Sequence, residues 1–287
     1  MRIISVPDKK KWFLFNKVEF YVNKHKSLKS SKLYKENFED IEKYCMFIGY
    51  PRSGHSIIGA LIDAHPNAII AHELDTLRYI EEGFDKNQIF YLLLINSKSF
   101  AKAGRTWDNY SYKVEKQWQG TFKKLKVIGD KKGGNSIKRI QSNPKLLQEL
   151  YKTIDKLPIK FIHIIRNPYD NITTMAKKHF NNNLKNAIDE YFSLCETVKN
   201  IKKQIKKNDV IDMKHESFVL NPKSNLESIC NFLGLDADVD YLKDCAKIVY
   251  NSPHKTRNDL KWTSNLINIV DNKIKEFEFL GGYSYDN

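Results

Sequence analysis

A turn bounded by two glycines, Gly49 and Gly54, joins a short apolar run to a segment with helical spacing. The run from Tyr44 to Gly49 predicts a strand that is buried on both faces. The segment from His55 to Ala64 has apolar residues at helical spacing and ends before Pro66. This order is typical of phosphate-binding loops, because backbone N–H groups in the turn and the N-terminus of the helix bind an anion together.

The alternation of short apolar runs with helical segments continues along the chain. Further strands are predicted at residues 68–71, 126–130, 159–165 and 210–213, and helices at 75–96, 144–154, 184–207, 225–233 and 263–277. Gly83 interrupts the first of these helices, and Thr263 or Ser264 caps the last. Strands that alternate with helices predict a single α/β domain at residues 44–287, with a central parallel β-sheet flanked by helices.

Two segments lack a clear period. Residues 1–43 are rich in lysine, and we interpret them as a basic N-terminal arm that contains some helix. The segment 251–261 is polar and basic, which predicts a mobile surface loop. The sequence contains no internal repeat and no linker-like change of composition, so a second domain is not expected.

The charge balance indicates an anionic partner. Lys and Arg number 48 against 34 Asp and Glu, a net charge of +14. Nucleic acid, a membrane surface and a phosphorylated or sulfated small molecule would all be attracted. The charge is scattered over helical segments such as 199–207, which favours solvated faces, and no nucleic-acid partner is expected. The longest apolar run, at 90–95, is far shorter than the about 20 residues that span a membrane.

The N-terminus and the cysteines bear on the compartment. Residues 1–20 lack the continuous apolar stretch of a signal peptide. The four cysteines form no C-x-x-C pair, and three lie in apolar or amphipathic surroundings, which favours buried free thiols over disulfides. We therefore expect a cytoplasmic protein. The cysteines are Cys45, Cys195, Cys230 and Cys245.

The phosphate-binding loop departs from that of a nucleoside triphosphatase. His55 stands where such a loop carries the lysine for the β- and γ-phosphates, and the cation comes earlier, at Arg52. This departure disfavours an ATPase or a kinase. A P-loop kinase-like phosphotransferase, a basic nucleic-acid-binding protein and a turn without a ligand stay open as alternatives.

A second candidate anion site follows the strand at 159–165. Arg166 comes directly after this strand, and Thr174 lies eight residues later, in a helix that opens near Tyr169. Open α/β sheets bind ligands at the carboxyl ends of their strands. An arginine fork beside a hydroxyl suits a phosphate monoester. Together with the first loop, this pair predicts two neighbouring anion sites.

These motifs resemble those of the PAPS-dependent sulfotransferase family, where PAPS is 3′-phosphoadenosine 5′-phosphosulfate. The run Pro51 to Ser56 resembles the family's 5′-phosphosulfate loop, P-K/R-S-G-T/S-T/S. Arg166, Pro168, Asp170 and Thr174 resemble its 3′-phosphate motif. Further similar segments are Gly129–Lys131, Met213–Phe218, Asn231–Leu235, Lys255–Arg257 and Lys261–Thr263.

The resemblance covers about residues 44–283 and implies a P-loop NTPase-like sulfotransferase fold. It implies PAPS as the sulfuryl donor, adenosine 3′,5′-bisphosphate (PAP) as the product, and no required metal. The acceptor would be a carbohydrate or another small molecule. His55, Thr174 and His215 depart from the family's usual residues, although none of these changes removes an anion contact.

The resemblance also implies roles for individual residues. Those expected at the 5′ end of the donor are Pro51, Arg52, Ser53, Gly54, His55 and Ser56. Those expected at the 3′-phosphate and the adenine are Arg166, Thr174, His215, Lys255 and Arg257.

Four residues are candidates for catalysis itself. Arg52 would stabilise charge on the phosphosulfate bridge, and Lys131 would supply a second cation near the sulfuryl group. A base must take the acceptor's proton. We favour Glu73, with His72 or His55 as alternates, and an alternative reading of Glu73 is a carboxylate at a helix N-terminus.

An aromatic segment at residues 104–122 has neither a strand nor a helix period. Aromatic faces suit sugar rings and flat molecules, so this segment either shapes the acceptor pocket or forms a satellite core. Its large rings are Trp107, Tyr110, Tyr112 and Trp118.

Overall fold

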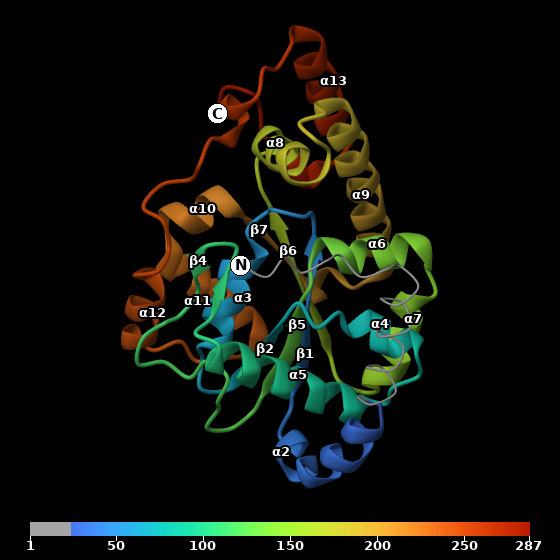
Figure 1. Cartoon of the computed structure of the whole chain (residues 1–287), viewed down its shortest axis with the longest axis vertical. Helices are drawn as coiled ribbons and strands as arrows, with labels where there is room; N and C mark the ends of the chain where they lie inside the picture. The colour runs from blue at the N-terminus through green and yellow to red at the C-terminus, as the bar shows by residue number, and fades with distance from the viewer. Residues whose placement is uncertain (1–23) are drawn as a thin grey trace, which may run out of the picture.

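Five parallel strands form the central sheet, in the order β2-β5-β1-β6-β7 (Figure 1). The computed structural model describes residues 24–287. All five predicted strands and their parallel arrangement are confirmed. The strands are β1 (Lys43–Gly49), β2 (Ala68–His72), β5 (Val127–Lys131), β6 (Ile159–Ile165) and β7 (Val210–Lys214).

Helices cover both faces of the sheet, because side chains along each buried strand point alternately to the two sides (Figure 1). In β1, Cys45 and Phe47 pack into one apolar cluster, whereas Tyr44 and Met46 pack into the other. The first cluster is completed by α3 (His55–Asp63), α10 (His215–Leu220), α11 (Pro222–Leu233) and α12 (Val239–Ala246). The second is completed by α2 (Lys35–Glu39), α4 (Thr76–Glu81), α5 (Lys86–Lys102), α6 (Gly134–Ser142), α7 (Leu146–Ile154), α8 (Pro168–His179), α9 (Leu184–Gln204) and α13 (Ser264–Ile274).

Most of the predicted helices are confirmed, including the break at Gly83 and the cap at Thr263, whose hydroxyl accepts from the N–H of Leu266. The helices α6, α10 and α12 were not predicted. The helix α6 begins directly after Gly133 and contains Gly134, and the glycine pair hides its start in a sequence pattern.

Residues 251–261 were expected to be a mobile loop, and this expectation is wrong for Thr256–Asp259. These residues form a short 3-10 helix that packs on α8. Its Arg257 is 3% exposed and donates from Nη2 to Oδ2 of Asp170 at 2.6 Å. A basic side chain that is buried with a partner anchors this segment to the core.

Of the predicted basic arm, residues 1–23 lie outside the described residues. Residues 24–33 are helical, and Phe38 and Ile41 are buried in the second apolar cluster. Residues 34–41 therefore contribute to the packing of the domain. Within residues 24–287, no helix is both long enough and apolar enough to cross a membrane. All four cysteines are buried and unpaired, as predicted.

A short antiparallel hairpin, β3 (Thr106–Trp107) and β4 (Tyr110–Ser111), stands apart from the main sheet. Its base is held by a buried ion pair between Arg105 and Asp63, the last residue of α3. The Asp63 carboxylate also accepts from the Ser97 hydroxyl and from the N–H groups of Ile70 and Gly120. One buried carboxylate therefore fixes where the hairpin leaves the core.

We expect Arg105→Met to lower the free energy of unfolding by about 3–5 kcal/mol, because it leaves the buried Asp63 carboxylate without its cation. Chemical denaturation followed by circular dichroism measures the change. The control is Lys152→Met, which removes an exposed ion pair with Glu149 and should change stability by less than about 1 kcal/mol. Equal effects of the two substitutions would contradict the anchoring role of Arg105.

Candidate active site

The carboxyl ends of all five parallel strands meet at one edge of the sheet, and each end contributes to one pocket of about 660 Å³. Arg52 follows β1, Glu73 follows β2, Lys132 follows β5, Arg166 follows β6 and His215 follows β7. This edge is where open α/β sheets bind ligands, beside the point where the chain order of the strands reverses. The pocket is therefore the candidate active site.

The phosphate-binding loop needs an unusual backbone. Arg52 has φ 70° and Gly54, which caps α3, has φ 102°. A Cβ atom on Gly54 would overlap Nδ1 of His215, so a side chain is excluded there on two grounds. The Ser53 hydroxyl is buried and donates to the carbonyl of Tyr50 at 2.9 Å. Ser53 thus uses its hydroxyl to hold the turn, which leaves its backbone N–H for an anion.

Two side chains from the far wall hold this loop in place. Asn171 of α8 donates from Nδ2 to the carbonyl oxygen of Pro51 at 2.7 Å. Arg166 donates from Nη1 to the carbonyl oxygen of Arg52 at 3.2 Å. The structure therefore brings together the two anion sites that the sequence predicts.

The second predicted anion site is a cluster of one guanidinium and two hydroxyl groups. Arg166 donates to Oγ1 of Thr174 at 3.4 Å and to Oγ1 of Thr256 at 3.2 Å. The two hydroxyls lie 3.1 Å apart, and both donate to the carbonyl of Asp170 at 2.8 Å. Thr256 lies inside the basic segment that the sequence singled out, but it was not among the predicted site residues.

Arg257 and Lys255 were expected to close over a bound nucleotide, and the structure does not bring either side chain into the pocket. The Arg257 guanidinium faces away, donating to the Asp170 carboxylate and to the carbonyl of Tyr285 at 2.5 Å. Lys255 is exposed and does not line the pocket, whereas its neighbours His254 and Thr256 do. Arg257, which the sequence motif suggested for a ligand, instead pairs with the buried carboxylate of Asp170.

A carboxylate and two ammonium groups lie at the other end of the pocket. Glu73 accepts from Nζ of Lys131 at 2.5 Å and pairs with Lys132 at 3.0 Å. Lys131 is 1% exposed and also donates to the Ser56 hydroxyl at 2.9 Å. Burial alone would raise the pKa of Glu73, but the two ammonium groups outweigh burial and hold that pKa below its usual range. Glu73 is therefore ionised.

Three of the histidines at or beside the pocket are neutral at pH 7, because burial lowers the pKa of His55 to about 4 and of His72 and His215 to about 3. Both ring nitrogens of His55 lie within hydrogen-bond distance of groups beside it, the Ser53 hydroxyl and the carbonyl of Ile48 in β1. His55 is thereby occupied and badly placed to accept a proton from an acceptor. Nε2 of His72 and Nδ1 of His215 are buried without a hydrogen-bond partner among residues 24–287.

The hairpin β3–β4 reaches across to the phosphate-binding loop. Asp108 at its tip pairs with Nη2 of Arg52 at 2.7 Å and with Nζ of Lys178 at 3.3 Å. These contacts hold the pKa of Asp108 below its usual value, mainly through the hydrogen bond from Arg52. Asp108 was not predicted, because it lies 56 residues from Arg52 and no local pattern marks the contact.

Only part of the predicted aromatic segment lies at the pocket. Trp107, Tyr110 and Tyr112 line the pocket, whereas Trp118 lies outside it. The rings of Tyr110 and Tyr112 are 4.7 Å apart, and Tyr110 lies 5.1 Å from the ring of Tyr250. The segment therefore adds aromatic rings to the wall of the pocket.

The match to a family model decides the identity of this site. The model described as the sulfotransferase family matches residues 46–239, about two thirds of the chain. The chain belongs to the sulfotransferase family. The matched segment of this sulfotransferase includes the phosphate-binding loop, Glu73, Lys131, Arg166 and Thr174. No curated protein matches the chain by sequence.

The chain is also similar to solved sulfotransferase structures. The sulfotransferase domain from the curacin biosynthetic pathway is 12% identical, with a TM-score of 0.52, covering 84% of this chain and 99% of that domain. The sulfotransferase domain of the Synechococcus PCC 7002 olefin synthase is 17% identical, with a TM-score of 0.48, covering 79% and 83%. A mouse sulfotransferase in complex with PAP is 14% identical, with a TM-score of 0.42, covering 82% and 84%.

Proposed function

We propose that this sulfotransferase transfers the sulfuryl group of PAPS to a hydroxyl or amine of a carbohydrate or another small-molecule acceptor, and releases PAP. One observation carries the proposal. The loop at residues 51–56 and the cluster around Arg166 are two anion sites, and Arg166 itself joins them through the carbonyl of Arg52. A ligand with anionic groups at both its 5′ and 3′ positions matches this pair, and PAPS is such a ligand.

The residues between the two anion sites fit a nucleotide. Gly54 has no Cβ atom, and the ring of His215 lies so close that a Cβ atom there would overlap it. Nδ1 of His215 is buried, and it has no partner within residues 24–287. A buried polar atom without a partner costs free energy, which a ligand hydrogen bond would recover. On this basis His215 holds the adenine or its sugar.

The chemistry proposed for the site is an in-line displacement at sulfur. The bond between sulfur and the bridging oxygen breaks, and a new bond forms between sulfur and the acceptor oxygen or nitrogen. Charge that builds up on the leaving PAP is balanced by Arg52 and by the N–H groups at the start of α3. The protein mainly positions the reactants and balances charge, as in phosphoryl transfer.

Glu73 is the base that we favour, and it receives the acceptor's proton. It is ionised, and it lines the pocket beside Lys132 and the Ser56 hydroxyl. Lys131 links Ser56 to Glu73 through its ammonium group. His72 remains the alternate, because its Nε2 has no partner among the described residues.

Arg257 has a positioning role in this proposal. Its ion pair with the Asp170 carboxylate holds the first turn of α8, where the Asp170 carbonyl accepts from the hydroxyls of Thr174 and Thr256. The 3′-phosphate would be bound by these hydroxyls and by Arg166. We also propose a cytoplasmic location, which the four buried free thiols support.

The chain is expected to bind PAP with a dissociation constant at least about tenfold lower than that for ATP, with or without Mg²⁺. The reason is that PAP places a phosphate in each anion site, whereas ATP has no 3′-phosphate for Arg166 and Thr174. Isothermal titration calorimetry measures both constants in buffers with EDTA or Mg²⁺. A preference for Mg-ATP would instead favour a kinase-like phosphotransferase.

Glu73→Gln should lower turnover with PAPS by about 10²–10⁴-fold, because it removes the base and keeps the size of the side chain. PAP affinity, measured by calorimetry, should change little. His72→Phe is the comparison, since it removes the alternate base and keeps a ring beside Phe100. A large loss of turnover in His72→Phe with normal turnover in Glu73→Gln would move the role to the histidine.

Asp108→Asn is expected to raise PAP affinity by about three- to tenfold, because the Asp108 carboxylate competes with an anionic donor for Arg52. The matched control is Asp259→Asn. Both carboxylates have 41% exposed side chains and an ion pair at 2.6–2.7 Å, but Asp259 does not line the pocket. Unchanged or weaker PAP binding by Asp108→Asn would show that Asp108 does not compete with the donor.

A further inference from the structure

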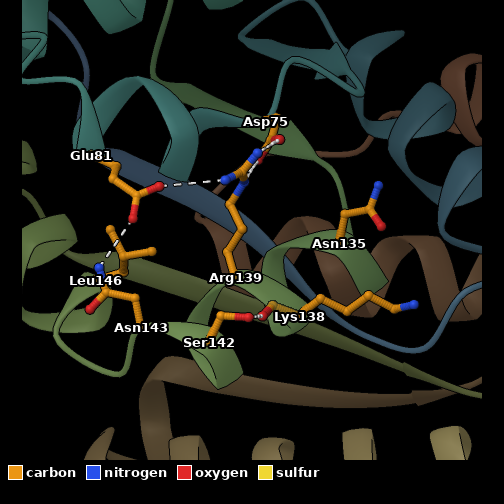
Figure 2. Close-up of a pocket in the computed structure, with 8 residues that line it drawn as sticks. All are labelled: Asp75, Glu81, Asn135, Lys138, Arg139, Ser142, Asn143 and Leu146. Atoms are coloured by element: carbon orange, nitrogen blue, oxygen red, sulfur yellow. Dashed lines mark hydrogen bonds and ion pairs between the residues drawn. The ribbon is translucent and has the colours of Figure 1, made fainter. Parts of the chain in front are cut away.

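A second, smaller pocket of about 280 Å³ lies beside the active site (Figure 2). Asn135 and Lys138, both on α6, line the two pockets, which therefore share a wall. The rest of the second pocket is formed by the turn after β2, the end of α4, the C-terminal end of α6 and the start of α7. A molecule bound near Glu73 can extend over this shared wall.

A rigid set of polar groups forms the floor of the second pocket. Arg139 points from α6 to Asp75 and donates from Nε and Nη2 to its two carboxylate oxygens, both at 2.7 Å (Figure 2). Glu81 lies 3.5 Å from Nη1 of Arg139 and accepts from the Asn143 amide at 3.2 Å. Each carboxylate oxygen can accept more than one hydrogen bond, so these fixed groups can still bind ligand hydroxyls.

Both cations that line the second pocket already have partners. Asp75 and Glu81 share Arg139, and Lys138 pairs with Glu190 of α9 at 2.5 Å. An anionic ligand would find no free cation there, whereas the two carboxylates can accept from ligand hydroxyls. Leu146 is the single apolar side chain among the lining residues, so a lipid chain would find no continuous run of apolar side chains there.

The size of the pocket also limits the ligand. A volume of about 280 Å³ corresponds to roughly nine water molecules at liquid density. This is room for one ring that carries several hydroxyl groups. The amide of Asn135 is exposed on the shared wall and makes no hydrogen bond within residues 24–287, so it is available to the same ligand.

A strained turn connects the two pockets. Glu73 faces the active site and Asp75 faces the second pocket, and both have left-handed backbone conformations, with φ 61° and 72°. The buried Asp130 carboxylate fixes this turn, since it accepts from the N–H of Leu74 at 3.1 Å and of Thr76 at 2.8 Å. Such conformations cost free energy, and they are concentrated at functional sites.

We propose that the second pocket is an acceptor subsite for one neutral sugar ring, and that the adjoining ring of the same oligosaccharide presents its hydroxyl to Glu73. This inference rests on the proposed function and narrows its acceptor to neutral oligosaccharides. The ring in the subsite binds through Asp75, Glu81 and Asn135, while the sulfuryl group is transferred to the ring in the active site.

The test uses a pair of neighbouring residues on α6. Ser142 is exposed and lines the second pocket, so Ser142→Leu fills the proposed subsite. Gln141 is also exposed, but its amide donates to the Ser193 hydroxyl at 2.7 Å and it lines neither pocket. Gln141→Leu is therefore the matched control. A second variant, Glu81→Gln, keeps the size of the side chain and removes one carboxylate of the subsite.

The measurement is transfer of radiolabelled sulfate from PAPS to neutral disaccharides, their component monosaccharides, simple phenols and primary amines. For the full chain, we expect a disaccharide to be a better acceptor than its monosaccharide. Ser142→Leu should raise KM for that disaccharide by about tenfold, the effect of losing one or two hydrogen bonds. Its turnover with the monosaccharide, and all constants of Gln141→Leu, should stay within about twofold.

Transfer to phenols or amines alone would overturn the inference, as would a disaccharide KM that Ser142→Leu and Glu81→Gln leave unchanged. PAP binding, measured by calorimetry, distinguishes a failure of the subsite from a failure of the proposed function. If the chain binds PAP but sulfates none of the saccharides, the subsite is refuted and the proposed donor stands. If the chain does not bind PAP, the proposed function fails, and the subsite fails with it.

Discussion

The hydrogen bond from Arg166 to the carbonyl of Arg52 is the contact on which the site depends. It joins the end of β6 to the loop after β1, and these two strands are neighbours in the sheet. Because the same guanidinium also reaches Thr174 and Thr256, one side chain fixes the spacing between the two predicted anion sites. The sheet places the ends of β1 and β6 side by side, and the contacts of Arg166 hold the segments that follow them together.

Burial of polar groups explains why the segments at this edge of the sheet have a defined arrangement. Asp170, Asp130 and Asp63 are three buried carboxylates, and each holds a segment that the site needs. Asp170 holds the 3-10 helix at Thr256–Asp259, Asp130 holds the turn after β2, and Asp63 holds the base of the hairpin. A buried carboxylate without its donors would be costly, so each of these segments is committed to a single position.

The features that could be predicted from the sequence are those encoded by neighbouring residues. The strands, the loop at residues 51–56 and the pair of Arg166 and Thr174 could be found because a buried strand and its following turn are encoded by consecutive residues. Asp108 could not be found, since its partner Arg52 lies 56 positions away and the two meet only through the hairpin. Arg257 was expected at a ligand because its segment resembles the family's basic C-terminal segment, whereas its contact with Asp170 becomes visible only in three dimensions. Sequence motifs indicate which groups are present, and the fold decides which of them are already occupied.

The lysines around Glu73 connect donor binding to the proton transfer that we propose. With both ammonium groups in contact, the Glu73 carboxylate has a lowered pKa and is a weak base. On the proposed mechanism, the sulfuryl group of a bound donor would bring anionic oxygens toward the same two ammonium groups, and these oxygens would share the positive charge with Glu73. A carboxylate that loses part of its countercharge in a buried site gains affinity for a proton. On the proposed mechanism, the donor therefore strengthens the base as it binds, and Glu73 takes a proton most readily when a sulfuryl group is in place to be transferred.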